Sequence, residues 1–186
     1  TTPSLEQRGL PLPDADAHGR EREAGAAFAL ALDEWRALTA VAQAGLARAT
    51  LDVGVQYAKD RQQFGKPIGA FQSLSHYLAD AVTRVDGAQV LVYEAAWARS
   101  MGRPIDQLAP MAKLFADQTF RDVTAMAQQI WGGVGFTLEY DIQLFFRRAK
   151  QLQLTWWDGP YLEELVAAQV LDGIAAARYT GTTVLL

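Results

Sequence analysis

The sequence predicts an all-α protein, an up-and-down four-helix bundle with an extra C-terminal helix. Long stretches without proline are rich in alanine, leucine, arginine and glutamate, residues that favour helices. Apolar residues recur three and four positions apart along these stretches, which is the spacing of one helix face. Glycine and proline interrupt the chain between the stretches, so the connections are short and consecutive helices are expected to run antiparallel.

The beginning of the chain has a different composition. The first twenty residues hold three of the seven prolines and almost no periodic apolar pattern. They predict an extended arm, a linker or the remnant of a preceding domain. We therefore expect an arm over residues 1–24, a helical bundle over residues 25–178 and a tail over residues 179–186.

The first helix is expected over residues 21–60, a window without proline. It should end near Gln63, because Gly65 and Pro67 follow. Its larger apolar residues recur at roughly helical spacing: Leu38, Val41, Leu46 and Val53. Its many alanines permit close packing of a neighbouring helix: Ala40, Ala42, Ala44, Ala47 and Ala49.

The second helix is expected over residues 73–101. Gly102 and Pro104 follow it, the usual punctuation of a helix C-terminus. Its apolar stripe is nearly complete: Leu74, Leu78, Ala81, Val85, Ala88, Val92 and Ala95.

Three further helices are expected, over residues 105–131, 139–153 and 161–177. Pro110 is compatible with the first of these if it lies in the first turn. Glycines at 132, 133 and 135 interrupt the chain before the next helix. The last residues, TGTTVLL, predict a frayed tail.

Composition excludes several classes of function. The 17 basic and 21 acidic residues give a net charge of -4, which argues against a nucleic-acid-binding surface. The chain has no cysteine, and its two histidines, His18 and His76, cannot form a multi-histidine metal cluster. No apolar run reaches the ~18 residues of a membrane span, and no signal peptide is recognisable. We expect a cytoplasmic protein without a metal site.

The turn after the first helix, residues 57–68, is the first candidate site. Arg61 lies there at a helix end, beside Phe64 and Gly65. A guanidinium can pair with phosphate oxygens while a ring offers a stacking face, so the turn suits a planar, anionic ligand. The alternative is an ordinary C-cap turn with a solvated arginine.

The segment QIWGGVGF, residues 129–136, is the second candidate. Three glycines in four positions let a backbone approach a ligand closely, and its N–H groups can bind phosphate or carbonyl oxygens. The spacing matches neither a dinucleotide-binding fingerprint nor a P-loop. The alternative is a loop that simply ends a helix.

Other polar residues have structural and functional interpretations. Asp33 and Arg36, three residues apart on the first helix, predict an intrahelical ion pair. His76 predicts a hydrogen-bonded structural histidine, and His18 a solvated one. Asp158 follows two tryptophans, so desolvation could raise its pKa and make it a base. It could equally be a turn residue before the last helix, with a proline at that helix's first position.

Three segments together resemble the signatures of one family, the acyl-CoA dehydrogenases, in their C-terminal helical domain. RQQFGKPI (residues 61–68), with Phe71-Gln72 and Leu78-Ala79-Asp80, is similar to the first signature. QIWGGVGFT (129–137) resembles the second, and RRAK (147–150) resembles the segment before the family's catalytic loop. The order and spacing agree over roughly residues 25–175.

The resemblance implies an FAD-dependent oxidoreductase that forms a homo- or hetero-oligomer, a dimer or tetramer. The reaction would remove an α proton from an acyl-CoA and transfer the β hydride to flavin N5, with an electron acceptor downstream. Asp33 and Arg36 match positions that bind the acyl-CoA. The residues matching contacts to FAD, which belongs largely to a neighbouring subunit, are Arg61, Gln63, Phe64, Gln72, Gln129 and Gly133.

Two departures from the family pattern shape these expectations. The family's N-terminal helical domain and middle β-domain do not fit in the first 25 residues, so we expect a fragment or a domain completed by a partner. The positions of the family's usual and alternative catalytic glutamates hold Trp156 and Trp35. Asp158 lies near the position of the family's glutamate-glycine pair if two residues are inserted, and the resemblance makes it the candidate base. The alternative function is a catalytically degenerate subunit, supplying half of a flavin site or an oligomerisation surface to an active partner.

Overall fold

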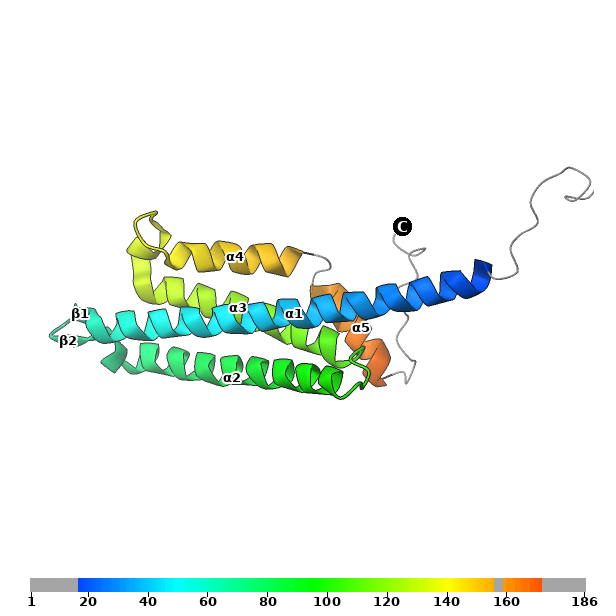
Figure 1. Cartoon of the computed structure of the whole chain (residues 1–186). Coiled ribbons are helices and arrows are strands. Elements are labelled where there is room, and N and C mark those ends of the chain that lie inside the picture. The colour runs from blue at the N-terminus through cyan, green and yellow to red at the C-terminus, as the bar shows by residue number, and fades with distance from the viewer. Residues whose placement is uncertain (1–16, 156–158, 172–186) are drawn as a thin grey trace, which may run out of the picture.

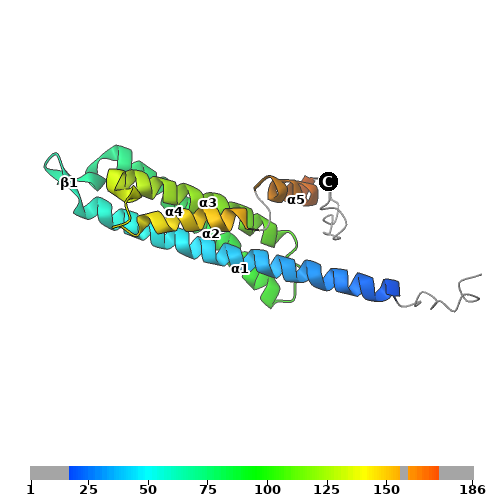
Figure 2. The same cartoon turned by 90° about the horizontal axis from the view of Figure 1, so that it is seen from above.

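The computed structural model describes residues 17–155 and 159–171. Four antiparallel helices and a fifth across one end make up most of this part of the chain (Figure 1; Figure 2). They are α1 (Ala17–Asp60), α2 (Gln72–Ser100), α3 (Leu108–Trp131), α4 (Ile142–Leu154) and α5 (Gly159–Leu171). The predicted all-α fold, a bundle with an extra C-terminal helix, is confirmed.

Helix α3 lies at the centre of the bundle. It packs against α1, α2, α4 and α5, and 13 of its 24 residues are buried. Pro110 is its third residue, as the sequence predicts. The first N–H groups of a helix have no partner within the helix, so a proline there costs no hydrogen bond.

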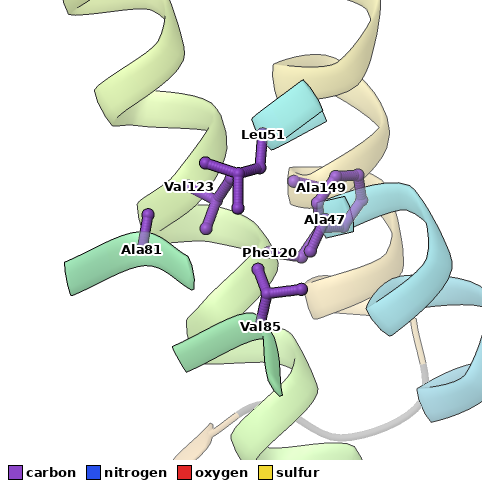
Figure 3. Packing of buried hydrophobic residues seen from close by; sticks show 7 residues of the cluster. All are labelled: Ala47, Leu51, Ala81, Val85, Phe120, Val123 and Ala149. Carbon is purple, nitrogen blue, oxygen red and sulfur yellow. The ribbon is translucent and has the colours of Figure 1, made fainter. Parts of the chain in front are cut away.

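The main core cluster draws on four helices (Figure 3). Phe120, fully buried on α3, is its largest side chain. A second cluster consists mostly of alanines from α1, α2 and α3, which lets these helix backbones approach closely. The residues of the main cluster are Ala47, Leu51, Ala81, Val85, Phe120, Val123 and Ala149.

The buried face of α1 differs from the one that its large apolar residues mark. Leu38, Val41 and Val53 are exposed, whereas Ala40, Ala44 and Ala47 are buried. Small residues let α1 pack closely on its neighbours, and the larger side chains lie on the outer side. On α2, by contrast, the predicted stripe is buried from Ala81 onward.

Several helix ends differ from the sequence-based boundaries. α1 begins at Ala17, inside the segment that we assigned to an arm, because alanine, arginine and glutamate dominate residues 20–24. α3 begins at Leu108 and α4 at Ile142, each three residues later than expected. α5 begins two residues earlier, at Gly159, and its expected end lies outside the described residues. Among the described helices, none combines the length and apolar character needed to cross a membrane.

The connection between α1 and α2 is a short β-hairpin, where we expected only a turn. β1 (Gln62–Gln63) pairs antiparallel with β2 (Lys66–Pro67), followed by the 3-10 helix η2 (Ile68–Ala70). The loop residues Phe64 and Gly65 both have positive φ, 52° and 78°. Two left-handed residues are the pattern of the type I′ turn, whose twist matches that of paired strands.

Candidate functional site

The hairpin holds Arg61 and its neighbours at the tip of the bundle (Figure 1). The backbone of Arg61 is fixed on both sides, since its N–H donates to Tyr57 O and its carbonyl accepts from Ile68 N, each at 2.9 Å. Its side chain is exposed and makes no ion pair within the described residues. Gln63 and Gln72 are exposed as well. The guanidinium group of Arg61 is therefore accessible to an anionic ligand.

Phe64 is exposed despite being aromatic. Its side chain is 91% exposed, and its backbone has the left-handed conformation that costs a non-glycine residue about 1–2 kcal/mol. The ring meets Phe71 edge-on at 6.2 Å between centroids, and the Lys66 ammonium lies 4.3 Å above Phe71. Neither burial nor backbone preference accounts for a phenylalanine at this position, so contact with a ligand is its candidate role.

The glycine-rich segment follows α3 as the 3-10 helix η3 (Gly132–Phe136). Gly132 has φ 65° and ends α3, while a Cβ on Gly135 would lie 3.0 Å from Trp131 Cβ. The structure thus requires glycine at both of these positions. It does not require glycine at 133, because the φ of Gly133 is not positive and a Cβ there would meet nothing within 4 Å. Gly133 is exposed, so its backbone is open to a ligand.

The structure brings the hairpin and the glycine-rich segment to the same end of the bundle (Figure 1; Figure 2). Ile68 and Ile130 share one buried cluster with Ala58. The Tyr57 and Trp131 rings stack at 4.1 Å. Gln129 is exposed on the last turns of α3, next to this contact. Two motifs far apart in sequence thus lie at one end of the bundle, which we call the hairpin end.

Asp33 and Arg36 form the predicted intrahelical ion pair, with 2.7 Å between Oδ1 and the guanidinium Nη1. Both residues are buried, at 8% and 5% exposure. Their neighbour Ala37 packs against Ala98, Ile105 and Ala109, at the end of the bundle opposite to the hairpin. With 1.5 Å of rise per residue, Arg36 and Arg61 lie roughly 37 Å apart along α1. The two groups of predicted site residues are therefore separate in this chain.

The remaining predictions have different outcomes. Asp158 and Trp156 lie outside the described residues, and so does the side chain of His18. His76 is exposed on α2 and makes no hydrogen bond to the part of the chain that the structure describes. The expectation of a hydrogen-bonded structural histidine is thus wrong, because His76 is exposed on α2.

The sequence analysis did not predict one buried polar cluster. Lys113 and Asp117 form an ion pair on α3, at 0% and 3% side-chain exposure, and Gln43 of α1 donates a hydrogen bond to Asp117. Burial raises the pKa of Asp117 above its ordinary value of 3.8, and Lys113 and Gln43 counteract this in part. The spacing of a lysine four residues before an aspartate, among alanines on one helix face, is the signal that could have revealed the pair.

Comparisons with known proteins agree with this arrangement. The family model described as acyl-CoA dehydrogenase, C-terminal domain, matches residues 25–169. Acyl-CoA dehydrogenase IpdE2 of Mycolicibacterium smegmatis is 44% identical over 112 residues, which cover 60% of this chain and 34% of that protein.

Solved structures give the same result. Butyryl-CoA dehydrogenase from Megasphaera elsdenii matches with a TM-score of 0.74 and 36% identity, covering 77% of this chain and 37% of that one. PigA with FAD and proline matches with a TM-score of 0.69 and 25% identity, covering 72% and 35%. The chain spans between 34% and 42% of the length of the first curated relatives. With the family model covering most of the bundle, the chain belongs to the acyl-CoA dehydrogenase family, whose C-terminal domain it contains.

Proposed function

We propose that this chain is the C-terminal domain of an FAD-dependent acyl-CoA dehydrogenase, which oxidises an acyl-CoA to the 2,3-enoyl-CoA within a larger enzyme or complex. The observation that carries the proposal is the hairpin end. There an exposed arginine, an exposed aromatic ring on a strained backbone and an open glycine lie at the same end of the bundle. Since the chain spans only part of its relatives, the complete activity requires further protein.

The residues of the hairpin end fit the ADP half of FAD. Arg61 would pair with the pyrophosphate, Phe64 would offer its ring to the adenine, and the Gly133 backbone would approach the same group. Gln63, Gln72 and Gln129 are exposed around them as amide donors and acceptors. When bound, FAD would accept the hydride that leaves the β carbon of the acyl-CoA.

The substrate contacts of the proposal lie elsewhere on the chain. Asp33 and Arg36 would bind the acyl-CoA, and Asp158 is the candidate base for the α proton. The distance of roughly 37 Å between Arg36 and Arg61 along α1 supports an oligomer. In it the hairpin end of one subunit completes the flavin site of another. An electron acceptor would then reoxidise the flavin.

The proposal is tested by titrating the complete assembly, this chain together with the protein that completes its flavin site, with FAD and with riboflavin, following the quenching of flavin fluorescence. Riboflavin lacks the ADP half, so we expect FAD to bind more tightly. Arg61→Ala removes a charge-assisted contact of about 1.5–3 kcal/mol, which corresponds to a loss in FAD affinity of about tenfold or more.

Lys59→Ala is the matched control. Lys59 is an exposed cation in the last turn of α1, two residues before Arg61, so its removal tests general attraction of anions. Equal losses in the two variants, or equal affinities for FAD and riboflavin, would contradict a specific site for the ADP half.

A specific observation favours a second candidate, a catalytically degenerate subunit. Tryptophans occupy both positions at which the family places its glutamate base, Trp156 and Trp35. The two functions are separated by adding acyl-CoA to the flavin-loaded assembly and following flavin absorbance. An active domain bleaches the flavin and loses most of this reduction in Asp158→Asn. A degenerate subunit with an active partner retains the reduction unchanged in Asp158→Asn.

A further inference from the structure

The buried cluster of Lys113, Asp117 and Gln43 links three helices. Lys113 and Asp117 lie on α3, and Gln43 reaches them from α1. The third helix is α4, because Lys113 Nζ lies 3.4 Å from the carbonyl oxygen of Leu152. One buried ammonium group is therefore shared between an aspartate of its own helix and the backbone of a neighbour.

Leu152 lies in the last turn of α4 (Ile142–Leu154). The carbonyls of a helix's last turn have no partner within the helix, and this end carries the negative pole of the helix dipole. α4 has no basic residue of its own in that turn. The cation that complements this helix end comes instead from the inside of the bundle, as Lys113 of α3.

The C-terminal half of α4 is only partly buried. Ala149 is buried, and Phe145 and Leu152 are partly buried against the main core cluster. Arg148, Lys150 and Leu154 are exposed. A helix of 13 residues is marginal by itself in water, so α4 depends on these contacts. Beyond Ala149, the inward contacts of the last turns include the partly buried Leu152 side chain and the Lys113 ammonium.

An apolar pair at these positions would fill the core at least as well. Burying two charges carries a desolvation cost, and exchanging such a pair for apolar residues of similar volume is often neutral or stabilising. Packing alone therefore gives no reason for a lysine at 113. An apolar side chain, however, cannot donate to the Leu152 carbonyl.

We propose that Lys113 is a positioning residue, whose ammonium holds the C-terminal turn of α4 and so fixes the point from which the connection to α5 begins. Asp158 follows Thr155 by three residues in that connection. This consequence for a base rests on the proposed function, whereas the anchoring of α4 does not.

The test compares the full chain with the double variant Lys113→Met/Asp117→Leu. This variant leaves no buried charge unpaired, so its free energy of unfolding in urea is expected to stay near that of the unchanged protein. Hydrogen exchange by mass spectrometry should nonetheless show the amides of residues 151–155 exchanging about tenfold faster. The amides of α3 should keep their protection.

A second variant keeps the test decisive if the double variant does not fold. In Lys113→Gln the side chain is one atom shorter, so it can still donate to Asp117 but falls short of Leu152. The same faster exchange over residues 151–155 is expected. Unchanged exchange there, in whichever of these variants folds, overturns the proposal and leaves Lys113 as one half of a structural ion pair.

Gln43→Met is the matched control. It removes the hydrogen bond to Asp117 but leaves the Lys113–Leu152 contact, so the α4 turn should keep its protection. In the flavin-loaded assembly, acyl-CoA should reduce the flavin more slowly when the chain carries a Lys113 substitution, whereas the affinity for FAD should stay the same. If the unchanged assembly shows no acyl-CoA-dependent reduction, the proposed function fails, and the exchange result still decides the role of Lys113.

Discussion

Buried threonines on α1 and α3 show how a single hydroxyl can matter. Thr50 donates its hydroxyl to the Leu46 carbonyl at 2.7 Å. The Thr119 hydroxyl is equally buried but has no hydrogen-bond partner within the part of the chain that the structure describes. Burial of an unpaired hydroxyl costs free energy, whereas a methyl group in its place costs none.

We therefore expect Thr119→Val to raise the free energy of unfolding by about 1 kcal/mol, since valine has nearly the same shape and removes the unpaired group. Thr50→Val is the control, and it should lower that free energy by a similar amount. Urea denaturation monitored by circular dichroism measures both. A destabilised Thr119→Val would show that the hydroxyl has a partner, such as a buried water.

The Lys113–Asp117 pair gives a pH-dependent prediction. Without Lys113, the buried Asp117 carboxylate loses its cation, and its pKa rises further above 3.8. When the pKa of Asp117 is higher in the folded than in the unfolded state, the protonated carboxyl group stabilises the folded protein at low pH. This stabilisation is lost as the pH rises from the unfolded-state pKa through the folded-state pKa. Lys113→Met should therefore cost about 3–5 kcal/mol at neutral pH and less in acid.

Urea denaturation at about pH 7.5 and about pH 4.5 measures this difference. Lys113→Met/Asp117→Leu is the control, because without the carboxyl group the difference from the unchanged protein should be much less dependent on pH. A cost of Lys113→Met that is the same at both pH values would contradict the assignment to Asp117.

At the scale of the element, the β1–β2 hairpin combines structural strain with a proposed contact. Phe64 occupies a left-handed loop position that asparagine or glycine adopts more readily. Its ring is exposed, so little burial is lost on substitution. The strain is retained at a residue that we propose contacts FAD.

Phe64→Asn should therefore raise the free energy of unfolding by up to about 1 kcal/mol while lowering the affinity for FAD. Thermal unfolding measures the first effect and the fluorescence titration the second. Phe136→Asn is the stability control, because Phe136 is also exposed but its φ is not positive. If Phe64→Asn leaves FAD affinity unchanged, Phe64 is not part of the ligand site.

At the scale of the whole molecule, α1 and α2 each carry exposed apolar side chains. Leu38 and Val41 project from α1, and a stripe at helical spacing projects from α2. Ion pairs join the two helices, between Arg99 and Glu34 and between Arg48 and Asp86. The stripe consists of Val90, Tyr93 and Trp97 of α2 and of Met101 directly after it. Aromatic residues and methionine are enriched in interfaces, so we infer that a second copy covers these side chains.

Leu38→Glu should shift the chain from dimer or tetramer towards monomer at micromolar concentration, measured by light scattering. Leu38 is 70% exposed, so the fold itself should be unaffected. Leu144→Glu, at an exposed leucine of α4, is the control and should leave the mass unchanged. An unchanged protein that is strictly monomeric would contradict the inference.

The sequence by itself determined the helices, their order and the residue types of the candidate site. Periodicity located the buried stripe of α2, because alanine and valine recur there three and four positions apart, which places them on one helix face. Glycine and proline marked the connections, since they interrupt helices for local reasons. The spacing of Asp33 and Arg36 was enough for their ion pair, which one helical turn brings together.

Only the tertiary structure decided which face of α1 is buried and which motifs meet. Hydrophobicity ranks leucine and valine above alanine, but close packing against α3 favours the smaller side chains, so Leu38 lies outside and Ala40 inside. The meeting of Ile68 with Ile130 at the hairpin end, and of Lys113 with the end of α4, depends on how separate helices align. Local sequence carries the propensity of each helix, whereas contacts between helices follow from the packing of the whole chain.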